Sequence, residues 1–337
     1  MSSSNVPLVV TMGDPAGCGP QITTQTWLDR DALDLAPFFV ISDPRVYERD
    51  VPVQTIEHPR HAADVFETAL PVLPFELPEI ETLKPGVASG RFATSIIESI
   101  ERATALCMAG DAAAMVTNPI AKSVLYEEGF AFPGHTEFIS SLCQGVQPKA
   151  PHPIMMLVGG GLRVALATIH VPLMKVLDHL TIETLTQTAK ITHRAMVEDF
   201  GLTDPKIAFT GLNPHAGENG AIGTEERDII NPAASELRSL GLNVSDARPG
   251  DTVFYEALNG QFDAVIAMTH DQGLIPVKTL DMWGGVNTTL GLPILRTSPD
   301  HGTAYDAAAA GQCRPDSLIA ALRLAAELAD NRARAHA

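Results

Sequence analysis

Three short apolar runs of this chain each lead to a histidine. They are LRVALATIH, KIAFTGLNPH and FDAVIAMTH, and they end at His170, His215 and His270. Each run is typical of a buried strand in a parallel sheet, and amphipathic helical segments lie between them. Because ligands bind outside the carboxyl ends of such strands, we expect these histidines to lie at one edge of a sheet.

The remaining pattern predicts an α/β protein with mostly parallel sheets. The predicted strands are Leu8–Thr11, Phe38–Ile41, Ala112–Val116, Ile154–Val158, Leu162–Ile169, Lys206–Thr210 and Ala264–Met268. The predicted helices are Pro20–Asp29, Ser89–Ala109, Lys122–Glu128, Ile182–Phe200 and Pro315–Arg334. Gly159–Gly161 is expected to turn an antiparallel hairpin, and the proline-rich stretch Pro71–Pro85 to form a surface connection.

Composition narrows the class of partner. The 337 residues carry a formal net charge of −17, which argues against nucleic acid or an anionic membrane as the main partner but allows a small anionic substrate. The four cysteines are scattered, as expected of reduced thiols. No apolar stretch has the roughly 18 residues of a membrane helix, and the first residues do not form a signal peptide. We therefore expect a cytoplasmic protein.

Three imidazoles at one sheet edge would form a metal site with positions open for substrate. Any one histidine is more often a hydrogen-bonded structural residue, so both interpretations stay open at this point. His215 lies in a turn, and His270 is followed by the carboxylate of Asp271. Imidazole ligands favour Zn²⁺, Co²⁺ or Ni²⁺, whereas carboxylates favour Mg²⁺.

Two further groups are candidates for anion binding. Gly134-His135-Thr136-Glu137 follows a proline and is expected to begin a helix, whose free N–H groups suit a phosphate or carboxylate; an ordinary helix cap is the alternative. Lys278, Asn287 and Arg296 lie among glycines and apolar residues, and Arg296 is expected at the end of a strand. The two cations would hold a doubly charged phosphate, unless they are ordinary surface residues.

The glycine-rich segment Gly13–Pro20 follows the first predicted strand. It is neither a G-x-G-x-x-G fingerprint nor a P-loop, and Pro15 removes one N–H donor. A nucleotide site, if the chain has one, must be constructed differently.

Several motifs in register resemble the 4-hydroxythreonine-4-phosphate dehydrogenase family of vitamin B6 synthesis. The resemblance extends from about Thr11 to Gly311. The motifs are GDPAGCGP, VTNPIAK, GHTEF, ATIHVPL, GLNPHAGE, GTEE, MTHDQGLIPVK, GVNTTLGLP and RTSPDHGTA. Together they are far more specific than any one of them.

This resemblance implies a role for most of the candidate residues. It implies that His170, His215 and His270 bind one divalent metal, with Zn²⁺ expected and Co²⁺ or Mg²⁺ as alternatives, in a site shared across a homodimer. It also implies a set of residues that hold the phosphorylated substrate: His135, Thr136, Lys278, Asn287 and Arg296.

The family is similar in fold to the isocitrate and isopropylmalate dehydrogenases, which have two α/β/α lobes. The resemblance implies a cofactor-side lobe of residues 1–125 plus 290–337, and a metal, substrate and dimerisation lobe of residues 126–289. Those enzymes bind adenosine with an HG[ST]A loop, matched here by His301, Gly302, Thr303 and Ala304. Asp306 would hydrogen-bond the ribose and repel a 2′-phosphate, which favours NAD over NADP.

The implied reaction is the oxidation and decarboxylation of 4-(phosphooxy)-L-threonine to 3-amino-2-oxopropyl phosphate. Lys278 and Asp271 are the candidates for proton transfer, although Lys278 is equally suited to binding phosphate alone. Cys18, Gln21 and Thr269 depart from the family pattern and weaken the choice of substrate. The alternatives are a related phosphorylated hydroxy acid such as threonate or erythronate phosphate, a dihydrodiol carboxylate, a metal-dependent hydrolase, or a binding protein without activity.

Overall fold

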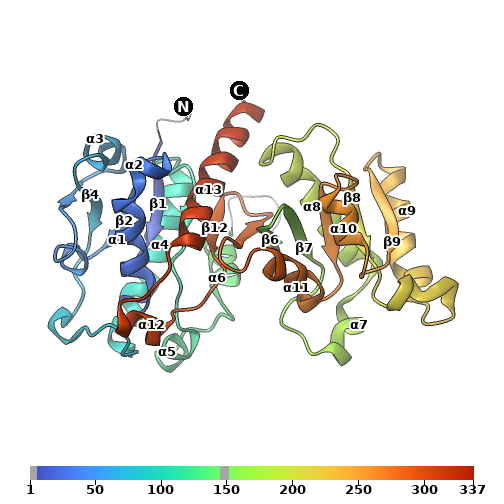
Figure 1. Ribbon diagram of the computed structural model, residues 1–337, viewed down its shortest axis with the longest axis horizontal. Helices are drawn as coiled ribbons and strands as arrows, with labels where there is room; N and C mark the ends of the chain where they lie inside the picture. Colours follow the sequence, from blue (N-terminus) through green and yellow to red (C-terminus); the bar gives the residue numbers. More distant parts are fainter. Residues whose placement is uncertain (1–5, 145–151) are drawn as a thin grey trace. The chain divides into compact units, whose positions relative to one another are not determined.

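The computed structural model describes residues 6–144 and 152–337, and it divides into two compact units (Figure 1). Unit 1 comprises Met1–Pro153 and Leu292–Arg334, and unit 2 comprises Ile154–Gly291 with the last three residues. The first change of unit falls later than the expected 125/126. This is because the helix that follows residue 134 packs against α4 (Ala93–Ala109) of unit 1.

Unit 1 contains six parallel strands, as expected for an α/β fold. In sheet order they are β3 (Val53–Thr55), β4 (Leu70–Pro74), β2 (Phe38–Ser42), β1 (Leu8–Thr11), β5 (Met115–Val116) and β12 (Arg296–Pro299). The helices are α1 (Gly19–Leu28), α2 (Arg30–Leu33), α3 (Ala62–Phe66), α4, α5 (Lys122–Glu127), α6 (His135–Leu142), α12 (Tyr305–Ala310) and α13 (Asp316–Ala335).

The core of unit 1 lies between its sheet and α4. Ile96 and Ile100 of α4 belong to one buried core cluster with the strand residues Val9, Phe39 and Met115. The spacing of the two isoleucines places them on one face of the helix. This packing fixes the carboxyl ends of β1 and β5, after which the candidate cofactor and substrate segments begin.

Unit 2 contains a mixed sheet. In order, its strands are β11 (Val286–Leu290), β6 (Ile154–Gly159), β7 (Leu162–Leu166), β10 (Ala264–Ala267), β8 (Ile207–Thr210) and β9 (Val244–Arg248). The β6–β7 hairpin is antiparallel, as predicted, whereas β7, β10, β8 and β9 are parallel. The helices are α7 (Val176–His179), α8 (Ile182–Glu198), α9 (Asn231–Ser239), α10 (Val253–Leu258) and α11 (His270–Leu280).

Three sequence-based expectations need correction. Leu70–Pro74, at the start of the expected surface connection, is strand β4 inside the unit 1 sheet. Arg296 begins β12 instead of ending a strand. The segment from His270 to Lys278 was not predicted as a helix, but it forms most of α11.

No helix among the described residues is long and apolar enough to span a membrane.

Candidate active site

Two of the three histidines meet at one sheet edge. Strands β7, β10 and β8 are parallel neighbours, so their carboxyl ends point the same way. The imidazole rings of His170 and His270 have centroids 5.5 Å apart. Both rings line a small cavity of about 230 Å³, together with Leu173, Val176 and Asp271. We call this cavity and its two imidazoles the histidine edge.

The orientation of the His270 ring is set by its neighbour. Nδ1 of His270 lies 2.8 Å from Oδ1 of Asp271, which leaves Nε2 as the atom for a ligand. This is the arrangement in which a carboxylate fixes the orientation of a metal-binding imidazole. Asp271 therefore orients the ring of His270.

His215 does not join the other two histidines within this chain. Among the described residues, no group of three or more histidine, cysteine or carboxylate side chains is arranged to hold a metal ion. His215 is exposed and lies in the segment Pro214–Gly220 that follows β8. The chemistry of the pair suits a borderline metal such as Zn²⁺, but one chain provides only two of the expected nitrogen ligands.

The segment that carries His215 has an uncommon backbone. Five consecutive residues from His215 to Asn219 have φ between 44° and 78°, and only one of them is glycine. For residues with a side chain, the left-handed conformation costs roughly 1–2 kcal/mol each. A conformation of this kind persists only where surrounding contacts stabilise it.

Asp271 and Lys278 lie on the same helix, α11, which begins at His270. Asn287 lies on β11, and its side-chain Oδ1 is buried without a hydrogen-bond partner among the described residues. A buried acceptor of this kind is costly unless a ligand or a water donates to it. Asn287 is therefore suited to accept a hydrogen bond from a ligand.

Unit 1 contains a separate group of anion-binding residues. Helix α6 begins at His135 after Gly134, and its first turn presents the N–H groups of His135 and Thr136, which no helical carbonyl satisfies. Nε2 of His135 is buried without a hydrogen-bond partner among the described residues. Burial lowers the pKa of His135 well below its usual value, and the positive charges of Arg296 and Lys122 lower it further. The ring is therefore neutral at pH 7.

Arg296 contributes a buried cation to this group. Its side chain is 4% exposed, and its Nε and Nη2 atoms lie 3.1 and 2.7 Å from Oγ1 of Thr117. Burial lowers the pKa of Arg296 to about 10, while the charge of Glu137 acts in the opposite direction. The guanidinium is still cationic at pH 7, and desolvation strengthens its attraction for an anion.

Lys122 belongs to the same group, although the sequence analysis assigned it no role. A Cβ added to Gly134 would lie 3.3 Å from Cε and 3.5 Å from Nζ of Lys122, so this lysine extends over the start of α6. The motif VTNPIAK ends at Lys122, but nothing in its spacing relates it to a helix that starts thirteen residues later. Together Lys122, His135, Thr136 and Arg296 form what we call the anion site.

The predicted cofactor loop packs against the glycine-rich segment. The Cys18 N–H donates to the carbonyl of Thr303 at 2.8 Å, and a Cβ on Gly17 would lie 2.9 Å from the same oxygen. The Tyr305 hydroxyl donates to Oδ2 of Asp14 at 2.5 Å. Burial raises the pKa of Asp14, and the hydrogen bond from Tyr305 opposes that shift. The two segments, far apart in sequence, form one surface.

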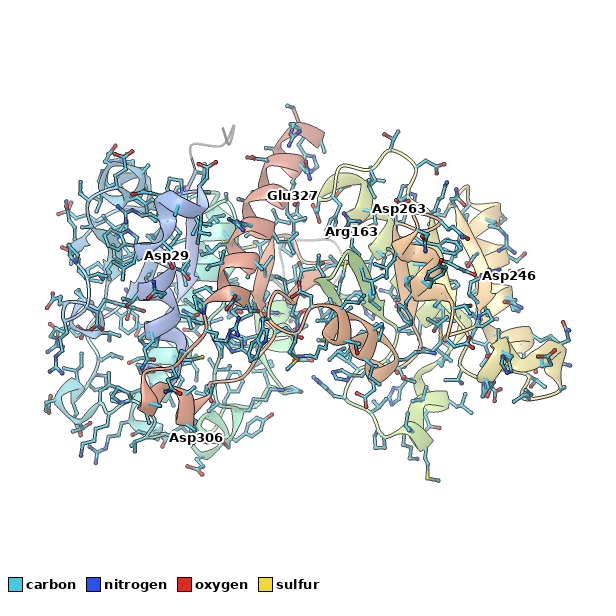
Figure 2. All side chains as sticks on the ribbon, viewed as in Figure 1. Asp29, Arg163, Asp246, Asp263, Asp306 and Glu327 are labelled. Atoms are coloured by element: carbon cyan, nitrogen blue, oxygen red, sulfur yellow. The ribbon has the colours of Figure 1, made fainter. Side chains whose placement is uncertain are left out.

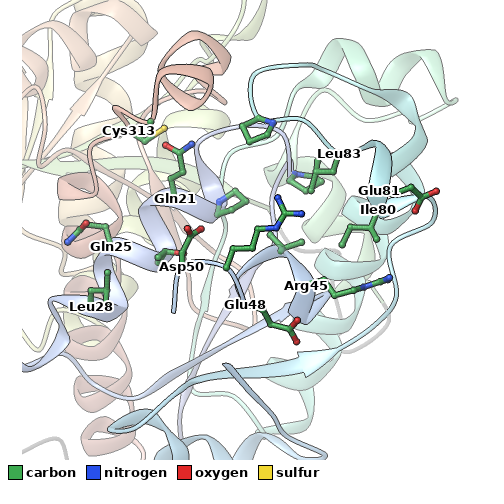
Figure 3. Close-up of a pocket in the computed structure, with 18 residues that line it drawn as sticks. Gln21, Gln25, Leu28, Arg45, Glu48, Asp50, Ile80, Glu81, Leu83 and Cys313 are labelled. Atoms are coloured by element: carbon green, nitrogen blue, oxygen red, sulfur yellow. The ribbon is translucent and has the colours of Figure 1, made fainter. Parts of the chain in front are cut away.

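Asp306 is exposed in the first turn of α12, where Figure 2 labels it. A cavity of about 1160 Å³ borders the same region of unit 1 (Figure 3). Its lining includes Gly17 and Gln21 and, just after α12, Gly311 and Cys313. Cavities for small molecules and cofactors are usually about 300–1000 Å³, so this one has room for a dinucleotide. No motif in the sequence indicated this cavity.

Comparison with known proteins gives the family of the chain. The chain is 47% identical, over 98% of its length and 96% of the relative's, to a 4-hydroxythreonine-4-phosphate dehydrogenase of Methylorubrum populi. A crystal structure of that enzyme from Klebsiella pneumoniae superposes with a TM-score of 0.85 at 36% identity, covering 96% of this chain and 99% of the other.

A more distant structure is a terephthalate 1,2-cis-dihydrodiol dehydrogenase from Burkholderia xenovorans. It has a TM-score of 0.66 and 25% identity, and the match covers 96% of this chain and 98% of the other. The family model for the pyridoxal phosphate biosynthetic protein PdxA matches residues 34–325. The chain is therefore an oxidoreductase that belongs to the PdxA family of pyridoxal phosphate biosynthetic proteins.

Proposed function

We propose that this chain oxidises 4-(phosphooxy)-L-threonine with NAD and releases 3-amino-2-oxopropyl phosphate and CO₂. The observation that carries the proposal is the anion site, where a buried guanidinium, an unpartnered imidazole nitrogen and a helix N-terminus converge. A phosphate monoester dianion matches that combination of donors. The names of the relatives support the same substrate.

The proposed reaction balances as follows. The carbon that bears the secondary hydroxyl gives a hydride to NAD⁺, and the hydroxyl gives up its proton. The resulting β-keto acid loses CO₂, and the carbon that carried the carboxylate takes up a proton. A divalent ion held by imidazoles would supply Lewis acidity that lowers the pKa of the hydroxyl.

The residues of this chain have distinct parts in that scheme. Arg296 and Lys122 neutralise the phosphate, and the first turn of α6 donates hydrogen bonds to it. Lys278 and Asp271 are the proposed groups for proton transfer, and Asn287 is suited to accept a hydrogen bond from the ligand through its buried Oδ1.

We further propose that the metal site is completed by His215 of a second copy of the chain. The support is the surface beside the histidine edge, where Leu173 is 77% exposed, Met174 94% and Leu177 49%. Large apolar side chains gathered next to a polar cavity mark an interaction surface. Because Leu173 also lines the cavity of the histidine edge, a partner covering this surface would lie beside the two imidazoles.

NAD is proposed to bind at the loop of His301, Gly302, Thr303 and Ala304 and in the adjoining cavity of unit 1. Asp306 is expected to repel a 2′-phosphate. Asp306→Asn should therefore raise the kcat/KM ratio of NADP to NAD by about tenfold, a change of roughly 1.4 kcal/mol. An unchanged ratio would remove Asp306 from cofactor selection. Unit 1 would then be the cofactor side, and unit 2 the metal and dimerisation side.

The cytoplasm is the proposed compartment. All four cysteines are free thiols in the structure, which suits a reducing environment.

A substrate panel tests the proposed reaction directly. NADH formation is measured with 4-(phosphooxy)-L-threonine, with phosphorylated threonate and erythronate, and with an aromatic cis-dihydrodiol carboxylate. The proposal expects the first compound to have a kcat/KM at least about 100-fold above that of the dihydrodiol, which has no phosphate for the anion site. Its kcat/KM should also exceed those of phosphorylated threonate and erythronate, which carry a 2-hydroxyl in place of its amino group. Higher kcat/KM for the unphosphorylated dihydrodiol would replace the proposed substrate.

A further inference from the structure

The motif GTEE, at residues Gly223–Glu226, has no part in the function proposed above. Its last residue, Glu226, is 3% exposed and begins a short π-helical turn, Glu226–Ile230. Oε1 of Glu226 accepts the backbone N–H groups of Leu212 and Asn213, both at 2.8 Å. Only Pro214 separates those two residues from the left-handed segment that begins at His215.

The second carboxylate oxygen of Glu226 reaches the same segment at two further points. Oε2 accepts a hydrogen bond from Nδ2 of Asn213 at 3.0 Å. A Cβ added to Gly217 would lie 2.5 Å from Oε2, so the carboxylate fills the space beneath the middle of the turn. His215 is therefore bracketed by Asn213 and Gly217, both of which are in contact with a single carboxylate.

The partners of Glu226 show what its charge does. Its hydrogen bonds come from two backbone N–H groups and one side-chain amide, and no lysine or arginine is paired with it among the described residues. A buried carboxylate held by N–H groups alone forms strong, charge-assisted bonds that fix the backbone it accepts from. That backbone includes the entry to five consecutive left-handed residues, which local preference alone would not maintain.

We propose that Glu226 is a positioning residue that holds the left-handed turn and thereby presents the imidazole of His215 in a fixed, preorganised position. The proposal rests on the proposed role of His215 as a metal ligand. Glu226 touches neither metal nor substrate in this scheme and acts only through the backbone from Leu212 to Gly217.

The test compares Glu226→Gln with Glu225→Gln as a matched control. Glu225 also accepts a hydrogen bond from Nδ2 of Asn213, at 2.7 Å, but its other bond is to the N–H of Thr224 and not to the turn. The substitution Glu226→Gln keeps the size of the side chain and removes its charge. It also places an amide N–H donor opposite the N–H donors of Leu212 and Asn213. Glu226→Asp, which keeps the charge, is the second variant in case Glu226→Gln folds poorly.

The first measurement is Co²⁺ binding to metal-free full-length protein by calorimetry. Loss of a group that orients a metal ligand typically costs about 10- to 100-fold in affinity, so Glu226→Gln should weaken Co²⁺ binding at least about tenfold. Glu225→Gln should change it by less than about threefold. Glu226→Asp should fall between the wild type and Glu226→Gln.

The second measurement needs no metal. Amide hydrogen exchange of Leu212 and Asn213 in the metal-free protein should accelerate at least about tenfold in Glu226→Gln and remain unchanged in Glu225→Gln. Exchange in β8 should stay as in the wild type, which separates local release of the turn from global unfolding.

The outcomes separate the proposed metal role of His215 from the proposed positioning role of Glu226. If the wild type and His215→Ala bind Co²⁺ equally, the proposed metal role of His215 fails, whereas the exchange data still decide whether Glu226 holds the turn. If His215→Ala loses Co²⁺ but Glu226→Gln keeps both wild-type affinity and wild-type exchange, the assignment of Glu226 is overturned.

Discussion

A single chain brings together the residues of the anion site in unit 1, but only two of the three expected imidazoles at the histidine edge in unit 2. At the anion site, Lys122, His135 and Arg296 are close enough for the two cations to shift the pKa of the histidine. At the histidine edge, the rings of His170 and His270 are 5.5 Å apart, but His215 lies elsewhere on a left-handed turn. Phosphate binding is therefore expected from a single chain, whereas metal binding is expected only from a pair of chains.

The two regions also differ in backbone. The anion site uses regular structure, since α6 and β12 hold its residues in ordinary conformations. In unit 2, by contrast, His170 at the histidine edge and His215 on its separate turn are both left-handed residues, with φ near 50°. Mutations in the first region should mainly change substrate affinity. Mutations in the second should mainly change metal occupancy and turnover.

The largest effect is expected from removing the third imidazole. His215→Ala and His170→Ala should each reduce kcat by at least about 1000-fold, because the metal would be lost in both sites of a dimer. Since His215 is exposed, unfolding temperature should change little.

Mixing His170→Ala with His215→Ala tests whether two chains share one metal site. If each site takes His170 from one chain and His215 from the other, half of the randomly mixed dimers contain one intact site. Activity should then recover to about one quarter of the wild-type value per subunit. A mixture that stays inactive after verified subunit exchange would contradict a metal site shared between chains.

The next largest effect concerns the buried cation of the anion site. Arg296→Ala should raise KM for the phosphorylated substrate at least about 100-fold, because truncating a desolvated charge partner costs roughly 2–5 kcal/mol. Arg296→Lys keeps the charge and tests whether the fold survives. Metal affinity, measured by calorimetry on the same variants, should not change. A loss of metal binding in Arg296→Lys would show that the two regions do not act separately.

A smaller effect is expected at Lys122, which is exposed. Lys122→Ala should raise both KM for the phosphorylated substrate and the inhibition constant of inorganic phosphate by about five- to tenfold, as for a solvent-screened charge. Lys190→Ala, on α8 of unit 2, is the matched control and should leave both constants unchanged. Wild-type phosphate inhibition in Lys122→Ala would remove this lysine from the anion site.

The smallest effect is a pH dependence of stability in unit 1. The pKa of His135 is lowered in the folded protein, so the unfolded chain binds a proton that the folded chain excludes once the pH falls below about 6.5. The stabilisation from His135 is complete above that pH and is lost as the pH falls. Between pH 7.5 and 5.5 the wild type should lose about 1 kcal/mol more than His135→Gln in denaturant unfolding. Equal losses would mean that His135 titrates normally.

The strands with continuous apolar sequence were predictable, and β4 was not. Leu70–Pro74 contains two prolines, which normally argue against a central strand. On the β3 side of β4, the N–H of Leu70 donates to the carbonyl of Pro52, and the N–H of Ile56 donates to the carbonyl of Val72. Because successive residues of a strand alternate in direction, the nitrogen of Pro71 faces β2. Pairing with β2 starts only at Val72. The missing N–H of Pro71 therefore leaves no ladder bond unmade.

The position of a candidate site residue was predictable where the strand that positions it lies next to it in the sequence. His170 and His270 follow adjacent parallel strands, so their proximity followed from the apolar runs. Contacts between distant segments did not follow. Glu226 under the His215 turn, Tyr305 on Asp14 and Lys122 over α6 depend on how separate elements pack, and no local periodicity encodes such packing.

Under the proposed function, a metal held by imidazoles enables this chain to oxidise a phosphorylated amino acid. The most direct measurement is NADH formation from 4-(phosphooxy)-L-threonine by protein treated with a chelator, before and after one equivalent of Zn²⁺ or Co²⁺ per subunit is added. We predict no turnover before addition and full turnover after it in the wild type, with no recovery in His215→Ala. Undiminished turnover in protein shown to contain no metal would contradict the account.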